Sequence, residues 1–174
     1  YWKVRLELRG TKVNLATLKH ADGTAVYPGT TAPPGGLNAI GELTMINDHQ
    51  AVLIERDNGG DSPATPRFKK LFLLTFDRSK PGSYASKTLL ADLMAIPDPD
   101  NVGGEPSASY SGYFRMPFVT IESVFPVDDH TLLVANDNNF PFSNGRAFSR
   151  GGALAADDNE LVTIGFDGTM DLDP

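Results

Sequence analysis

The sequence predicts an all-β protein, and three observations support this prediction. Strand-like runs recur along the chain and are separated by clusters of Asn, Asp, Gly and Pro, the residues that dominate turns. No segment keeps apolar residues at the i, i+3, i+4 and i+7 positions of an amphipathic helix for three turns. Two stretches of strands also match each other along the chain. A repeated strand–turn–strand–loop–strand unit is typical of repeat architectures.

The repeat is clearest where an apolar strand runs into short polar side chains. Residues 52–57 and residues 132–137 both follow this pattern, and an offset of 80 residues aligns Asp57 with Asp137. The same offset aligns Glu42 with Glu122 in the preceding strands. The next strands, at 71–77 and 161–167, align at an offset of 90, because the second copy has about ten extra loop residues. Three antiparallel strands per unit, with polar residues at matching strand ends, predict blades of a β-propeller.

The chain divides into three regions on this interpretation. Residues 1–36 hold partial blade strands and a loop, residues 37–112 the first blade with its connection, and residues 113–174 the second blade. The expected strands of the two blades lie at 39–46, 50–56, 68–77 and 86–93, and at 118–126, 131–136 and 160–167. A propeller needs at least four blades. We therefore expect the remaining blades to come from sequence outside these residues or from another chain.

Composition excludes several classes of function. The net charge of −7 and the sequence pI near 4.8 argue against a nucleic-acid-binding surface. No run reaches the 18 or more apolar residues of a membrane span. The absence of cysteine rules out disulfides and thiolate metal sites, although it leaves the cellular compartment open.

Part of the sequence resembles a known family. Residues 118–124, residues 132–143 and the pair Gly145-Arg146 resemble the bacterial phytase-like proteins, which are also described by an "esterase-like activity of phytase". The resemblance covers about residues 37–168, and its most specific part is the run from Asn136 to Ser143. It implies a propeller that hydrolyses phosphoric or carboxylic esters and binds a small anionic ester as its substrate. We expect such a protein to be extracytoplasmic, either periplasmic or secreted.

Acidic and amide side chains at the strand ends are candidate calcium ligands. Ca²⁺ prefers six to eight oxygen ligands from carboxylates, amides and backbone carbonyls. The candidates are Glu55, Asp57, Asn136 and Asp137. In the alternative interpretation, the residues from Asp137 to Asn139 only cap the strand through Asx turns.

Glu122 and Asp137 are the candidate catalytic residues. Glu122 lies among apolar residues in the strand expected to line the central channel, where a charge is costly unless it is paired or bound to a metal. Its alternatives are a structural ion pair with an arginine, or a solvent-facing position. Arg56 and Arg146 are candidate substrate-binding residues, because a guanidinium suits bidentate recognition of phosphate or carboxylate. Asn138 completes this set.

A catalytic triad is not expected. The sequence has no Gly-x-Ser-x-Gly motif. His49 and His130 lie in matching hairpin turns, at the opposite end of the blades from Asp57 and Asp137. Water activated by Ca²⁺ is therefore the expected nucleophile, near a channel mouth where the candidate residues of both blades converge. The competing hypothesis is a non-catalytic propeller that binds a ligand or a protein and uses the same acidic loops structurally.

Overall fold

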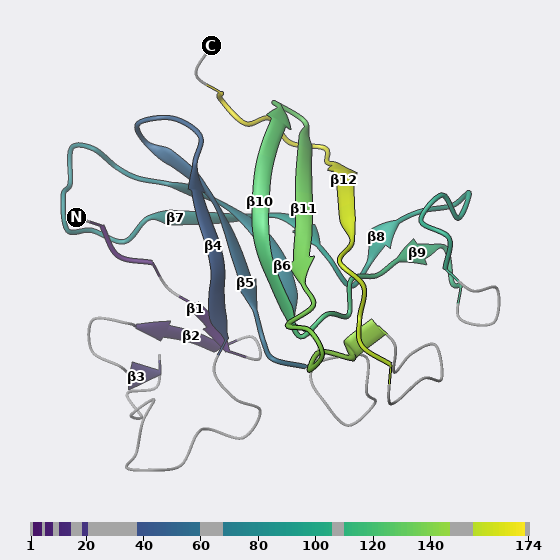
Figure 1. Ribbon diagram of the computed structural model, residues 1–174. Coiled ribbons are helices and arrows are strands. Elements are labelled where there is room, and N and C mark those ends of the chain that lie inside the picture. Colours follow the sequence, from purple (N-terminus) through teal and green to yellow (C-terminus); the bar gives the residue numbers. More distant parts are fainter. Residues whose placement is uncertain are drawn as a thin grey trace.

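The computed structural model describes residues 2–4, 6–8, 11–14, 19–20, 38–59, 68–105, 110–146 and 155–172 (Figure 1). Every named element in these ranges is a β-strand, and the strands of each sheet pair antiparallel. The all-β prediction is therefore confirmed for this part of the chain. No helix within it is long and apolar enough to cross a membrane.

The first large sheet contains four strands in chain order. They are β4 (Ala39–Met45), β5 (Gln50–Arg56), β6 (Lys69–Thr75) and β7 (Ser86–Asp92). Each lies within two residues of its predicted range. The β4–β5 hairpin closes through an Asx turn, in which Asn47 Oδ1 accepts a hydrogen bond from the His49 N–H at 2.9 Å.

The second large sheet contains three strands, which also match their predicted ranges to within two residues. They are β10 (Thr120–Asp128), β11 (Thr131–Asp137) and β12 (Leu161–Gly165). Its first hairpin closes in the same way as that of the first sheet, since Asp128 Oδ1 accepts a hydrogen bond from the His130 N–H at 2.9 Å.

Two smaller sheets complete the described fold. β8 (Ile96–Pro97) pairs with β9 (Tyr113–Phe114), and neither strand is among the seven expected from the sequence. Near the N-terminus, β1 (Leu6–Leu8), β2 (Thr11–Asn14) and β3 (Lys19–His20) form a third antiparallel set. The rest of the region 1–36, including the loop expected there, lies outside the described residues.

The main hydrophobic core lies between the two large sheets. β10 packs against β4 and β5, and Figure 1 shows β10 beside β4. Alternate side chains of both sheets fill the space between them, as expected for strands with one buried face. The fully buried members from these strands are Val52, Ile54, Leu71, Ile121, Leu132 and Val134. A second cluster on the far side of the first sheet packs against Val4, Phe68 and Ala85.

Side chains of β4 hold the exposed backbone edge of β10. Glu42 Oε2 accepts a hydrogen bond from the Val124 N–H at 2.6 Å, and Thr44 Oγ1 donates one to the Val124 carbonyl at 3.0 Å. Gly41 lets the strands approach closely, because a Cβ at this position would lie 2.2 Å from the Ile121 carbonyl oxygen. The carboxylate of Glu42 thus bridges the two sheets.

The hydrogen-bond ladders of the two sheets match at a shift of 81 residues. Arg56 pairs with Ala39, and its counterpart Asp137 pairs with Thr120. Each first strand then has a bulge, between Ile40 and Glu42 in β4 and between Ile121 and Ser123 in β10. The alignments of Asp57 with Asp137 and of Glu42 with Glu122 are therefore wrong by one residue. In the ladders, Asp57 corresponds to Asn138, and Glu42 corresponds to Ser123.

This single residue matters because a one-residue shift exchanges the two faces of a strand. At a shift of 81, Leu53 on the far face of the first sheet corresponds to Val134, which faces the first sheet. Equivalent faces of the two sheets therefore point in the same direction, and the sheets stack front to back. A shift of 80 would instead equate two faces that meet in the same core.

Candidate functional site

An ion pair joins the two large sheets at the end where β5 and β11 finish. Arg56 Nη2 lies 3.0 Å from Glu122 Oε1, and Arg56 Nη1 donates a hydrogen bond to Asn58 Oδ1. The Arg56 side chain is 10% exposed and that of Glu122 is 40% exposed. The Arg56 Nε atom is buried without a hydrogen-bond partner. Of the predicted residues, Glu122 and Arg56 are the two that the structure brings together from different sheets.

Glu55, a predicted metal ligand, is fully buried and pairs with a lysine of β7. Its Oε1 accepts a hydrogen bond from Asn38 Nδ2 at 2.9 Å, and its Oε2 pairs with Lys87 Nζ. The Lys87 ammonium also lies 3.9 Å from the centroid of the Phe72 ring, where a cation–π contact stabilises it. Both carboxylate oxygens of Glu55 are thus bound by neighbouring side chains.

Asp57, a second predicted metal ligand, pairs with a fully buried lysine. Lys69 Nζ lies 2.6 Å from Asp57 Oδ1 and donates to the Asp57 carbonyl at 2.6 Å. Asp57 Oδ1 also accepts from the Gly59 N–H at 3.0 Å, and Oδ2 accepts from the Phe68 N–H at 2.9 Å. Burial lowers the pKa of Lys69, and the charge of Asp57 partly offsets this effect. The pair closes the base of the loop between β5 and β6.

Amide side chains at the end of β11 bind the segment that precedes β12. Asn136 Nδ2 donates to the Asp158 carbonyl at 3.0 Å, and Asn136 Oδ1 accepts from the Glu160 N–H at 2.6 Å. Asn138 Nδ2 donates to the Asp157 carbonyl at 3.0 Å. Both amides therefore fasten this loop to the strand.

Asp137 is the exposed member of this cluster. Its Oδ1 accepts from the Asn139 N–H at 2.8 Å, and Asn138 Oδ1 accepts from the Phe140 N–H at 3.1 Å. These are two successive Asx turns, as in the capping alternative. Asp137 also pairs with Thr120 in the ladder, two residues from Glu122, so the two candidate catalytic carboxylates lie at the same end of the sheet.

Arg146 is buried in a network of its own. Its Nη1 lies 2.8 Å from Glu105 Oε1, its Nε lies 2.7 Å from Glu160 Oε1, and its Nη2 donates to the Arg115 carbonyl. The rings of Phe114 and Phe118 each lie 5.0 Å from its guanidinium carbon. The structure does not place Arg146 beside Arg56.

Asp157 organises the turn that carries Arg146. Its carboxylate accepts hydrogen bonds from Ser143 Oγ and from the N–H groups of Gly145 and Arg146, at 2.7 to 2.9 Å. Sequence reasoning did not single out Asp157 and Glu105, and it did not recognise Lys69 as the partner of Asp57, because each lies far along the chain from its partner. The available sequence signal for Lys69 was its place just before the apolar run 71–74.

The predicted calcium ligands do not form a fitting site in this arrangement. Glu55 and Asp57 are neutralised by Lys87 and Lys69, and the Asn136 oxygen accepts a backbone N–H. In the part of the chain that the structure describes, no three carboxylate or imidazole groups cluster as a metal site would require. Ca²⁺ binding stays a prediction.

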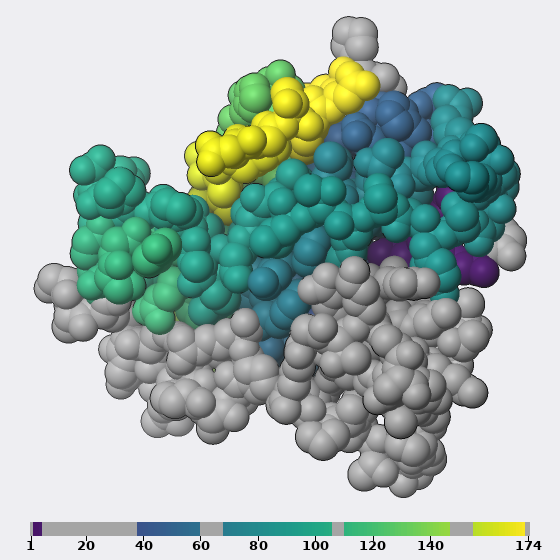
Figure 2. Space-filling view, turned by 180° about the vertical axis from the view of Figure 1, so that it is seen from behind, coloured from purple at the N-terminus to yellow at the C-terminus, as the bar shows by residue number. Residues whose placement is uncertain are grey.

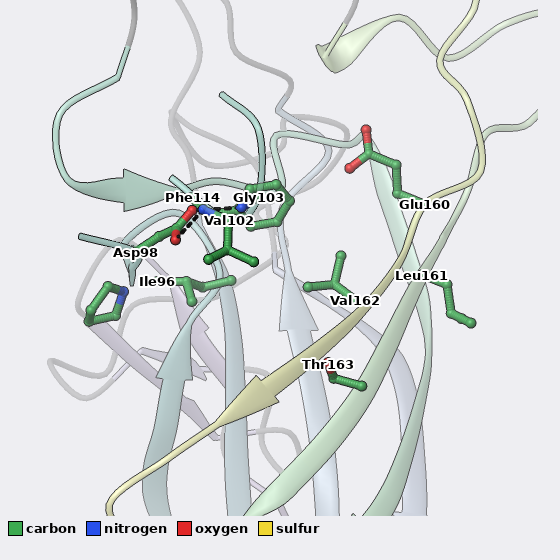
Figure 3. Close-up of a pocket in the computed structure, with 10 residues that line it drawn as sticks. Ile96, Asp98, Val102, Gly103, Phe114, Glu160, Leu161, Val162 and Thr163 are labelled. Atoms are coloured by element: carbon green, nitrogen blue, oxygen red, sulfur yellow. Dashed lines mark hydrogen bonds between the residues drawn. The ribbon is translucent and has the colours of Figure 1, made fainter. Parts of the chain in front are cut away.

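A pocket of about 450 Å³ lies between β12 and the β8–β9 hairpin. Ile96 and Val162 face each other across it (Figure 3). Asp98 also lines the pocket, and its carboxylate accepts hydrogen bonds from the N–H groups of Val102 and Gly103, both at 2.8 Å. A second, larger groove is lined by residues of β7 and β12. In Figure 2 the yellow C-terminal segment lies along the teal region that includes β7. Neither hollow is lined by a predicted site residue.

The fold and the site define an all-β protein of two stacked antiparallel sheets, with an arginine–carboxylate pair joining their ends. Comparison with known families identifies it further. The model of the phytase-like family, described as "esterase-like activity of phytase", matches residues 4–140. This is well over half of the chain, so the chain belongs to the phytase-like family. The match begins earlier than the resemblance noted in the sequence and ends before Phe142 and Arg146. No curated protein and no solved structure matches the chain.

Proposed function

We propose that this protein is a hydrolase of phosphoric or carboxylic esters that acts at the ends of β5, β10 and β11. The family supports this reaction class through its description, and the matched residues include Arg56, Glu122 and Asp137. The observation that carries the location is the Arg56–Glu122 pair. It joins a nearly buried guanidinium, with one N–H group unpartnered, to a carboxylate that reaches solvent.

Each residue of this group has a chemical role in the proposal. The guanidinium of Arg56 binds an oxygen of the anionic ester, since charge-assisted hydrogen bonds from arginine are strong and directional. The Glu122 carboxylate accepts a proton from water, whose oxygen attacks the ester carbon or phosphorus and displaces the alcohol. Asp137, exposed at the same sheet end, is the second acidic group available for proton transfer.

We also propose that the two large sheets are successive blades of a β-propeller. Their matching ladders, their matching bulges and their front-to-back stacking all support this arrangement. On this proposal the remaining blades come from further sequence or from another chain. An extracytoplasmic location is part of the same proposal, and fractionation of the native host cells would test it.

Hydrolysis of p-nitrophenyl phosphate and p-nitrophenyl acetate tests the reaction, with Glu122→Gln as the first variant. Loss of a general base is expected to lower kcat by a factor of about 10² to 10⁴. Asp137→Ala should also reduce turnover. Asp129→Asn is the matched control, because this carboxylate is 54% exposed in the opposite hairpin turn. Undiminished turnover in Glu122→Gln, or loss of turnover in the control, would contradict the assignment. Assays with added Ca²⁺ and with a chelator test calcium assistance in the same experiment.

A non-catalytic binding module is the second candidate, and one observation favours it. Most of the charged residues predicted for chemistry are neutralised inside the fold, including Glu55, Asp57 and Arg146. A binding module needs no activated water and no accessible base. If the wild-type protein turns over neither ester but binds phosphate or a carboxylate with an affinity that depends on Arg56, this second function is the correct one.

A further inference from the structure

One face of the first sheet and one face of the second sheet differ sharply in their exposure to solvent. The face of the first sheet that meets the second sheet contains Val52, Ile54 and Leu71, and each is 0% exposed. The outer face of the second sheet carries Phe125, which is 62% exposed, and Leu161, which is 68% exposed. Large apolar side chains that share one face of a sheet are unusual at a free surface.

These two faces occupy equivalent positions in their sheets. The shift of 81 that matches the ladders takes Val52 and Ile54 onto Leu133 and Ala135. The third strands match at a shift of 90, which takes Leu71 onto Leu161. Phe125, Leu133, Ala135 and Leu161, with Ser123, therefore form the counterpart of a face that is covered by a sheet in the first repeat. We call these five residues the outer face.

We infer that a third antiparallel sheet of the same repeat, in the same polypeptide, packs on the outer face. The inference rests on the blade arrangement proposed above and does not depend on ester hydrolysis. It continues the interface already present between the two large sheets, since the outer face repeats one side of that interface.

The contacts between the sheets indicate the chemistry of the partner strand. Glu42 and Thr44 of β4 bind the N–H and the carbonyl of Val124 on the edge of β10. Ser123 and Phe125 occupy the equivalent positions on β10. The first strand of the third sheet should therefore present a free backbone edge to the Ser123 hydroxyl. It should also present an apolar side chain to Phe125, because Phe125 lacks the hydroxyl of Thr44.

A second copy of this chain fits the outer face less well than a third sheet of the same polypeptide does. Front-to-back stacking of a second copy would use the far face of its first sheet. That face is already covered, because Ala51, Leu53 and Leu74 are 0% exposed and pack with Val4, Phe68 and Ala85. A sheet whose equivalent face is open is the better complement.

Thiol labelling of the complete natural gene product tests the inference. The 174 residues contain no cysteine, so Ser123→Cys adds the one thiol within them, and mass spectrometry of the peptide that contains residue 123 follows its labelling. A maleimide should label this thiol at least about 100-fold more slowly than the exposed control Asp129→Cys, as expected for a covered sheet face. Light scattering should give the mass of one polypeptide. Leu161→Cys provides a second position on the same face if Ser123→Cys does not fold.

Two outcomes would overturn the inference. Equal labelling of Ser123→Cys and Asp129→Cys under native conditions would show that the outer face is open. Protection that appears only at concentrations where the mass doubles would show that a second copy covers it. Because labelling does not depend on turnover, failure of ester hydrolysis would leave this test unaffected.

Discussion

The ends of β5 and β11 occupy equivalent positions in their ladders, yet their polar side chains find different kinds of partner. β5 ends in the charged residues Glu55, Arg56 and Asp57, whereas β11 ends in Asn136, Asp137 and Asn138. The charged end binds side chains from three other strands, namely Lys69 of β6, Lys87 of β7 and Glu122 of β10. The amide end binds the backbone of one segment, residues 157–160.

This difference follows from what each side chain requires when it is buried. A buried carboxylate must be paired with a cation, and the cation must come from another part of the fold. An amide carries both a donor and an acceptor, so it can satisfy a loop backbone directly. The charged end is therefore a tertiary junction, and the amide end is a local fastening of one loop. Four predictions test this comparison, from the largest expected effect to the smallest.

The first prediction concerns the buried lysine of the charged end. Lys69→Met removes the cation that neutralises Asp57 and leaves a carboxylate that is 5% exposed without its ion pair. Breaking a buried pair by removing one partner costs about 3 to 5 kcal/mol. Urea denaturation should show a loss of this size in the free energy of unfolding. Lys70→Met is the matched control, because Lys70 is 27% exposed and pairs with the partly exposed Asp92. Equal losses of stability in both variants would contradict the interpretation of the charged end as a tertiary junction.

The second prediction concerns the bulge at the start of β4, where this strand approaches β10. Gly41→Ala places a Cβ 2.2 Å from the Ile121 carbonyl oxygen and should force the sheets apart. Overpacking of this kind costs about 1 to 3 kcal/mol. Gly165→Ala has no atom within 4 Å of its new Cβ and should not destabilise the protein. Thermal unfolding of both variants measures the difference, and an unchanged melting temperature for Gly41→Ala would show that the sheets are not in close contact there.

The third prediction concerns the amide end. Asn136→Ala leaves the Asp158 carbonyl and the Glu160 N–H without their side-chain partner. Such a loss costs about 1 to 3 kcal/mol, and less where water reaches the freed groups. Hydrogen exchange should increase in residues 155–160 and stay unchanged in β5 and β6. Faster exchange throughout both sheets would show that the amide end is also a tertiary junction.

The fourth and smallest prediction compares the hairpin turns at the opposite end. Asp128 and its counterpart Asn47 accept the same hydrogen bond from a histidine N–H. That hydrogen bond lowers the pKa of Asp128 below 3.8, and a second one from Thr131 adds to the effect. Asp128 therefore stabilises the fold above pH 3.8, and this contribution disappears as the pH falls through its lowered pKa. Asp128→Asn should weaken the acid sensitivity of unfolding as the pH falls below 3.8. Identical acid transitions would contradict the prediction.

The site could be predicted only in part. The pairing of Glu122 with an arginine was recognised as an alternative, because an isolated carboxylate among apolar residues requires a partner. The Asx turns after β11 were also recognised, since their hydrogen bonds join residues two positions apart. The partners of Glu55, Asp57 and Arg146 were not, because they lie 12 to 41 residues away along the chain. The predicted offset of 80 was also wrong by one residue, so it paired Asp57 with Asp137 where the ladders pair it with Asn138.

The sequence by itself determined the strands of the two large sheets, their hairpin turns and the all-β class of this protein. These features depend on alternation, β-branched residues and turn residues within a few positions of one another, so local physical chemistry is sufficient. The tertiary structure decided the register that relates the two large sheets, which faces of the sheets meet, and which charges neutralise each other. A shift of one residue between the two sheets exchanges the faces of a strand, and the apolar runs 52–54 and 132–134 align at either offset, so their pattern does not reveal it. The ion pairs then depend on that register, because only packed sheets bring Arg56 to Glu122.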